Sequence, residues 1–169
     1  RHRDVAAVAL VDGGWIHLSD RFPTFEECWE QLEPPVFDGW TRAELEQRAR
    51  GWNSDWPEEG RLGALANFGD LPDGTVRPHL AREHHRSIVH SLWQDDPRPL
   101  YGGVQAPTLL MPAVDAVPVG RTPVTEALEQ IPDTKIAWYV DAHHDLHAQQ
   151  PQRCADDLLA LAARADARG

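Results

Sequence analysis

The chain has 169 residues, which is enough for one domain with a substantial core and too few for two full-sized domains. Its hydrophobic content of 41% and charged content of 25% are typical of a soluble globular protein. The formal net charge of −11 and the lack of a basic stripe argue against a nucleic-acid partner. The apolar runs, of about ten residues at most, are too short to span a bilayer, so we expect no membrane partner and a cytoplasmic location.

The first element is a continuous apolar run over residues 5–11. A run of this kind predicts a strand that is buried on both faces of a parallel sheet. Asp12 and two glycines close the strand, and the glycines permit a sharp exit. The sequence has neither a methionine start nor a secretory signal peptide. We therefore expect these residues to be the later part of a longer protein.

Residues 16–98 differ in character and predict a mainly helical insertion. Two capping boxes, at residues 24–27 and 41–44, each precede a run with helical spacing. Pro34-Pro35 should end the first helix and Gly51 the second. Beyond them, residues 64–68 and 75–78 predict a small hairpin with a turn at Asp73-Gly74. Residues 82–93 predict a further helix with one buried stripe.

After a break at residues 95–99, strand and helix patterns alternate. The order is a strand at 107–111, a helix at 123–131, a strand at 135–140 and a helix at 151–164. Such alternation implies parallel strands joined by right-handed crossovers. The predicted fold class is therefore α/β.

The last strand and the last helix are joined by a loop that is rich in titratable side chains. It contains three histidines and two aspartates: Asp141, His143, His144, Asp145 and His147. A loop at the carboxyl end of a strand is the usual place for binding and chemistry in an α/β protein. His144 lies just past the strand and is suited to act as a general base. The alternative is a loop histidine that only caps backbone groups.

Two aspartates are candidates to orient that imidazole. Asp115 follows the strand at 107–111, where a carboxylate can hold a neighbouring histidine in one tautomer. Asp12 follows the first strand and competes for the same role. Taken alone, either residue is also compatible with an ordinary turn aspartate.

The sequence supports neither a metal site nor a nucleophile within these residues as well as it supports the base and the acid. The loop histidines do not have the spacing of an H-E-x-x-H site, and no glycine-rich phosphate loop occurs, so we expect no metal and no cofactor. No Gly-x-Ser-x-Gly motif is present, and the four serines all fall in the helical insertion. Cys28 and Cys154 are expected to be reduced helix residues rather than nucleophiles. The sequence thus offers a base and an acid without a nucleophile.

Together these segments resemble the C-terminal half to two-thirds of an α/β-hydrolase. Residues 5–13 are similar to the strand that follows the nucleophile helix. Residues 104–115, with a Pro-Thr-Leu start and a trailing acid, resemble the penultimate strand, and residues 142–151, in which a histidine precedes a proline by seven residues, resemble the final segment. The resemblance implies a core strand at 1–15, a helical cap at 16–98 and the C-terminal part of the hydrolase core at 99–169.

The resemblance also implies an activity, namely serine-type hydrolysis of a carboxylic ester, thioester, lactone or amide. His144 would be the base and Asp115 the acid, with Asp12 the alternative acid used by some members. Trp15, Trp40 and Trp56 would bound a pocket for a partly apolar small-molecule substrate. The nucleophile would belong to a missing N-terminal half of the same protein.

Two rival hypotheses remain. In the first, the absent nucleophile is an aspartate, and the same histidine activates water in an epoxide hydrolase or dehalogenase. In the second, the chain is a non-catalytic binding module or an inactive fragment.

Overall fold

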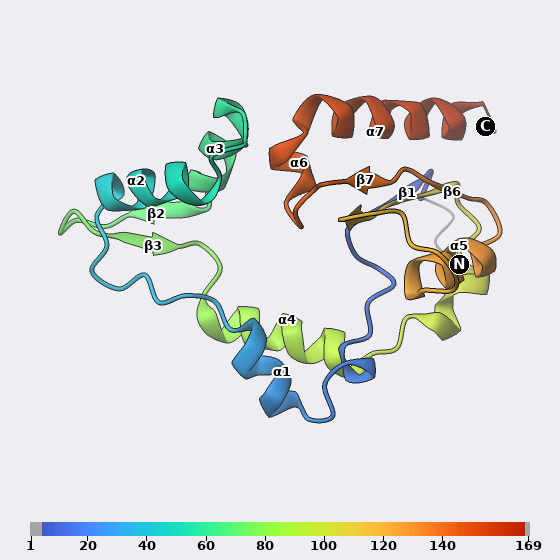
Figure 1. Cartoon of the computed structure of the whole chain (residues 1–169), viewed down its shortest axis with the longest axis horizontal. Helices are drawn as coiled ribbons and strands as arrows, with labels where there is room; N and C mark the ends of the chain where they lie inside the picture. The colour runs from blue at the N-terminus through green and yellow to red at the C-terminus, as the bar shows by residue number, and fades with distance from the viewer. Residues whose placement is uncertain (1–4, 168–169) are drawn as a thin grey trace. The chain divides into compact units, whose positions relative to one another are not determined.

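The computed structural model describes residues 5–167, so the outer ends of the predicted ranges 1–15 and 99–169 lie outside it. The chain divides into two compact units (Figure 1). Unit 1 contains the described residues up to Ile16 together with those from Asp96 onward. Unit 2 is His17–Asp95, which falls within the range predicted as a helical insertion.

Unit 1 is built on a parallel sheet, as the alternating pattern predicted. Three strands, β1 (Val8–Val11), β4 (Thr108–Met111) and β6 (Thr134–Ile136), pair in the order β1-β4-β6. Both pairings are parallel, with Leu10 opposite Leu110 and Leu110 opposite Ile136. The predicted α/β fold class is confirmed.

A second, shorter parallel pair continues beyond this sheet. It joins β5 (Ala113–Val114) to β7 (Tyr139–Val140), so the single strand predicted at 135–140 is in fact divided in two. Pro112, between β4 and β5, has no N–H to donate to a ladder. The register nevertheless continues across the break, because the Ala137 N–H bonds to the Leu110 carbonyl and the Tyr139 N–H bonds to the Pro112 carbonyl, each at 2.9 Å. The division therefore reflects the one ladder hydrogen bond that Pro112 cannot donate.

Two helices of unit 1 lie at the predicted positions, and two short ones were not predicted. The first two are α5 (Pro123–Gln130) and α7 (Pro151–Asp166), and the short ones are η2 (Arg98–Gly103) and α6 (Leu146–Gln149). α5 begins at a capping box made by Thr122 and Thr125, with Pro123 at its first turn. The short helix α6 lies inside what the sequence predicted to be a loop.

The core of unit 1 lies on both faces of β4, because successive side chains of a strand point to opposite faces. Leu110 packs on one face with Trp15, Tyr101 and the buried residues of α5. Leu109 and Met111 pack on the other face with Tyr139 and with apolar side chains of α6 and α7. All four residues of β4 are buried, which explains why its sequence is apolar without alternation.

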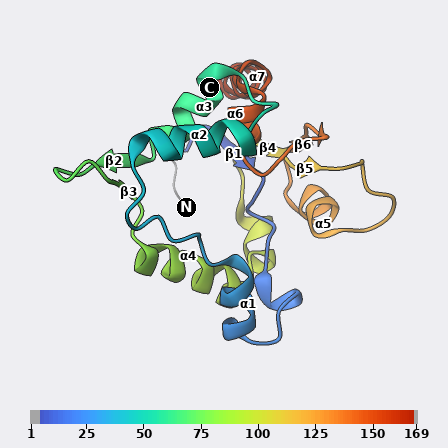
Figure 2. The same ribbon diagram turned by 60° about the vertical axis from the view of Figure 1, so that its left-hand side comes forward.

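Unit 2 is mainly helical. It contains η1 (Leu18–Asp20), α1 (Phe25–Leu32), α2 (Arg42–Trp52), α3 (Glu58–Leu65), β2 (Phe68–Asp70), β3 (Val76–Pro78) and α4 (Arg82–Gln94). Figure 2 shows α1 lying along α4, and the two share a small core with Phe22, Cys28 and Val89 buried. The hairpin β2–β3 is antiparallel, with Phe68 opposite Pro78. Helix α3 was not predicted, since its two glycines weaken the helical signal.

The described residues contain no helix with the length and apolar character needed to cross a membrane.

The burial of β4 leads to a prediction about stability. Leu110 is fully buried, and Leu110→Ala should lower the free energy of unfolding by about 2–5 kcal/mol, because it leaves a cavity between the sheet and α5. Leu100→Ala is the matched control, since that side chain is 68% exposed and should change stability by less than about 0.5 kcal/mol. Urea denaturation of the full chain, followed by tryptophan fluorescence, measures both. Equal losses would contradict the assignment of Leu110 to the core.

The two cysteines are free and buried, and their reactivity is predictable. Burial raises the pKa of both thiols, and for Cys28 the nearby Arg21 charge only partly opposes this effect. A raised pKa means less reactive thiolate at a given pH, so the folded chain should react slowly with Ellman's reagent at pH 8. Unfolding in urea should release two fast-reacting thiols. Fast reaction of either thiol in the folded chain would contradict this description.

Candidate active site

Three segments of unit 1 converge where its parallel strands end. Asp12 directly follows β1, Ala113 opens β5 just after β4, and His144 lies in the loop after β7. Parallel strands present their carboxyl ends at the same edge of a sheet. The pairing of these strands therefore gathers residues that are far apart in the sequence.

The turn after β1 fixes the position of the Asp12 carboxylate. Asp12 has a φ of 45°, a left-handed conformation that aspartate tolerates better than most residues. Gly14 follows with a φ of 86°, and a Cβ atom at this position would lie 2.8 Å from the Leu10 side chain. The Asp12 Oδ1 atom accepts a hydrogen bond of 2.9 Å from the Ala113 N–H. The carboxylate is thus held by the neighbouring strand.

The loop that carries His144 is held by contacts of the residues before and after it. Gln149 accepts a hydrogen bond of 2.8 Å from the His143 N–H and donates one of 3.3 Å to the Asp141 carbonyl. Leu146 is fully buried in the core of unit 1 and anchors the start of α6. Sequence analysis did not single out Gln149 or Leu146, although a glutamine and a leucine at helical spacing are compatible with such a short helix.

Asp12 and His144 form a hydrogen-bonded pair. The distance from His144 Nδ1 to Asp12 Oδ2 is 2.8 Å, and the exposed fractions of the two side chains are 77% and 19%. An ionised carboxylate only accepts hydrogen bonds, so it holds the proton on Nδ1. Nε2 is then the proton-accepting nitrogen on an exposed ring. This is the arrangement of a general base with its orienting acid.

The structure brings His144 to Asp12 and not to Asp115, which the sequence analysis had favoured. Asp115 is exposed just beyond β5, and in residues 5–167 no hydrogen bond or ion pair links it to His144. The physical reason is the additional pairing of β5 with β7. In that register Val114 lies opposite Val140, and the Asp141 N–H bonds to the Val114 carbonyl. Asp115 is therefore carried past the turn that presents His144.

The neighbouring histidines have other positions. The His143 backbone bonds to Gln149, and His147 lies within α6. Within the described part of the chain, no three histidine, cysteine, aspartate or glutamate side chains converge as metal ligands do.

The three tryptophans predicted to bound a pocket are engaged in packing. Trp15 is buried in the core of unit 1. In unit 2, Trp56 is 6% exposed, and Trp40 lies among Phe37, Trp52 and the Arg48 guanidinium, whose carbon is 4.2 Å from the ring centroid. Their role in substrate binding stays a prediction.

A further polar cluster, not anticipated from the sequence, supports the base of the His144 loop. Tyr139 is fully buried in β7, and its hydroxyl donates a hydrogen bond of 2.7 Å to Asp157 of α7. Burial and this carboxylate raise the pKa of Tyr139 far above its usual range, so the phenol stays protonated. The Arg153 guanidinium carbon lies 4.0 Å from the centroid of the ring. These contacts fix β7 against α7 directly before the loop begins.

The comparisons with known proteins agree with this arrangement at the level of the fold. No protein-family model and no curated protein matches the chain. Among solved structures, E-2-(acetamidomethylene)succinate hydrolase matches with a TM-score of 0.67 and 17% identity over 94% of this chain. The thioesterase domain from the curacin biosynthetic pathway matches with a TM-score of 0.61, 16% identity and 93% coverage. An esterase from a marine microorganism matches with a TM-score of 0.50, 22% identity and 92% coverage.

These solved structures are α/β-hydrolases, and this chain has the fold of the C-terminal part of such a protein. The resemblance inferred from the sequence is confirmed for the fold. The chain spans 58–59% of the length of these three structures.

The geometry of the pair leads to a prediction about the tautomer of His144. With Asp12 as the acceptor, the neutral ring should carry its proton on Nδ1, and ¹⁵N chemical shifts of the labelled full chain report this directly. Asp12→Asn should shift the population towards the Nε2-protonated form, which is the usual preference of free histidine. Asp115→Asn should leave the spectrum unchanged. A tautomer shift in Asp115→Asn alone would contradict the pairing described here.

Proposed function

We propose that this protein is a serine-type hydrolase in which His144 is the general base and Asp12 the acid that orients it. The observation that carries the proposal is the 2.8 Å contact between His144 Nδ1 and Asp12 Oδ2 at the carboxyl ends of parallel strands. The substrate class is a carboxylic ester, thioester, lactone or amide. Two of the similar solved structures are named as a thioesterase domain and an esterase, which favours an acyl ester or thioester.

The proposed reaction has two halves. In the first, Nε2 of His144 takes the hydroxyl proton of a serine as its oxygen attacks the substrate carbonyl. The bond to the leaving group then breaks, and the same nitrogen returns the proton to that group. In the second half, His144 activates water to release the acyl group from the serine. Asp12 stabilises the imidazolium that forms in each half.

The proposal places the nucleophile outside these 169 residues. The four serines all belong to unit 2, where Ser19 lies in η1, Ser54 follows α2, and Ser87 and Ser91 lie within α4. None of them is at a strand-to-helix turn, the usual position of the nucleophile in this fold.

The edge of the sheet supports this view. In the described part of the chain, β1 pairs with β4 along one side, and no strand pairs with its other side. Val5 and Val11, at the two ends of the apolar run that contains β1, are 48% and 37% exposed. An apolar strand with an open edge is an aggregation risk that proteins normally cover. We propose that a further strand of the complete protein, from the part that carries the serine, pairs with β1.

The test is hydrolysis of p-nitrophenyl butyrate by the full-length protein and its variants. His144→Ala should abolish turnover, whereas His143→Ala and His147→Ala should retain most of it. Asp12→Asn should lower kcat by about 10⁴-fold, the effect of the equivalent change in a serine protease. Asp115→Asn is the matched control and should stay within a few-fold of the wild type.

Three outcomes would overturn parts of this proposal. A large loss in Asp115→Asn with little change in Asp12→Asn would reverse the choice of acid. Equal losses in all three histidine variants, with recovery on adding zinc, would indicate a metal site instead. A single turnover in H₂¹⁸O that labels a protein carboxylate would indicate an aspartate nucleophile.

A further inference from the structure

The imidazole of His144 is 77% exposed, so side-chain packing does not fix its position. The ring meets Asp12 through the 2.8 Å contact of Nδ1 with Oδ2. Asp12 is itself held by the Ala113 N–H, so the backbone of the loop has to bring the ring to the carboxylate. The contacts that hold residues 141–143 therefore decide whether the pair forms.

The chain turns sharply between the end of β7 and His144. Asp141 has a φ of 56°, in the left-handed region that residues other than glycine seldom adopt. Its N–H still belongs to the sheet, where it bonds to the Val114 carbonyl at 2.9 Å. Beyond this point the pairing of β5 with β7 has ended, and the Asp141 carbonyl and the His143 N–H bond to a side chain instead.

Gln149, the last residue of α6, bridges these two backbone groups with one side chain. Its Oε1 atom accepts a hydrogen bond of 2.8 Å from the His143 N–H, and its Nε2 atom donates one of 3.3 Å to the Asp141 carbonyl. A primary amide can make both bonds because it carries an acceptor and two donors. The bond to His143 is the shorter of the two and lies within the usual range for N–H···O contacts. It holds the residue directly before His144.

The position of Gln149 is in turn set by buried residues of α6. Leu146 is fully buried and Ala148 is 8% exposed. The backbone of the helix is also closed by hydrogen bonds, from the Gln149 N–H to the Asp145 carbonyl at 3.1 Å and from the Gln150 N–H to the Leu146 carbonyl at 2.8 Å. The Gln149 amide therefore projects from an anchored segment and links the exposed loop to the core of unit 1.

We propose that Gln149 is a positioning residue of the active site, which holds the His144 imidazole against Asp12 by binding the His143 N–H. It acts through the backbone of the loop and not on the substrate. The expected effect on turnover rests on the proposed function, whereas the effect on the His144–Asp12 pair does not. Loss of positioning should appear in kcat and not in KM, because a base displaced by about 1 Å can slow the reaction about 10²-fold without weakening substrate binding.

The test compares three variants of the full-length protein in the hydrolysis of p-nitrophenyl butyrate. Gln149→Met keeps the length of the side chain but removes both hydrogen-bonding groups, and it should lower kcat by about 10- to 100-fold with KM within about twofold. Gln149→Glu keeps an acceptor for the His143 N–H, so its kcat should stay within about threefold of the wild type. Gln150→Met is the matched control, since the Gln150 side chain accepts a hydrogen bond of 3.2 Å from Arg153 of α7, and it should change neither constant.

Two NMR measurements on the ¹⁵N-labelled full-length protein test the positioning without hydrolysis. In the wild type and in Gln149→Glu, the His143 amide proton should exchange slowly with solvent, and the neutral His144 ring should carry its proton on Nδ1. In Gln149→Met the same amide should exchange at least about tenfold faster, because its hydrogen bond is gone. Part of the His144 population should then shift to the Nε2-protonated form.

The outcomes separate this proposal from the proposed function. Unchanged amide exchange and an unchanged tautomer in Gln149→Met would overturn the positioning role, whatever the protein hydrolyses. Absence of turnover in the wild type, with the expected NMR changes, would overturn the proposed function and support the positioning role. A loss of kcat in Gln149→Glu or Gln150→Met as large as that in Gln149→Met would contradict the role of the His143 bond. Circular dichroism shows whether each variant is folded; should Gln149→Met not fold, Gln149→Asn, whose amide is one methylene too short, takes its place with the same expected losses.

Discussion

The parallel pairing of β4 with β1 on one side and β6 on the other is the constraint on which the rest of unit 1 depends. β4 is buried along its whole length, and its alternate side chains form the cores on both faces of the sheet. The same register sets the end of β1 level with the end of β4, so that Asp12 meets the Ala113 N–H and the His144 ring. A shift by one residue would exchange the two faces of β4 and also separate this pair.

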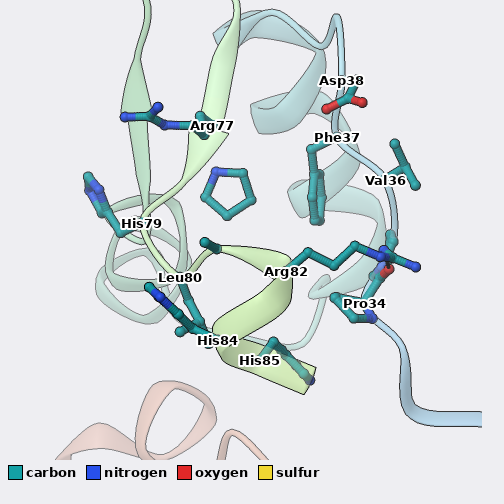
Figure 3. Close-up of a pocket in the computed structure, with 13 residues that line it drawn as sticks. Pro34, Val36, Phe37, Asp38, Arg77, His79, Leu80, Arg82, His84 and His85 are labelled. Atoms are coloured by element: carbon teal, nitrogen blue, oxygen red, sulfur yellow. Dashed lines mark hydrogen bonds between the residues drawn. The ribbon is translucent and has the colours of Figure 1, made fainter. Parts of the chain in front are cut away.

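Contacts with neighbouring segments fix the positions of both members of the His144–Asp12 pair. Asp12 is held by the strand beside it, and the His144 loop is held by Gln149 and Leu146, while the imidazole itself stays exposed. An acid that is already fixed before reaction needs no reorganisation when the imidazolium forms. In unit 2, Arg82 holds the start of α4 to the loop after α1 in a similar way, through Glu33 and the Pro34 carbonyl. Figure 3 shows the Arg82 side chain extending to Pro34.

Most of the fold could be predicted from the sequence because apolar runs, capping boxes and the Asp73-Gly74 turn are local signals. The choice of acid could not be made in that way. Asp12 and Asp115 each follow an apolar strand, and only the register of β5 on β7 decides which of them reaches His144, a contact that spans 132 positions in the sequence for Asp12. The break at Pro112 and residues 137–138, the glycine-containing helix α3 and the packing of the three tryptophans likewise depend on tertiary contacts.

The most direct test of the central claim is labelling of the full-length protein with a fluorophosphonate, followed by mass spectrometric mapping of the adduct. If His144 serves a serine nucleophile, one serine outside these 169 residues should be labelled, and His144→Ala should abolish the labelling while His147→Ala retains it. Labelling that is absent from the wild-type protein, that falls on a serine of unit 2, or that persists unchanged in His144→Ala would contradict the claim.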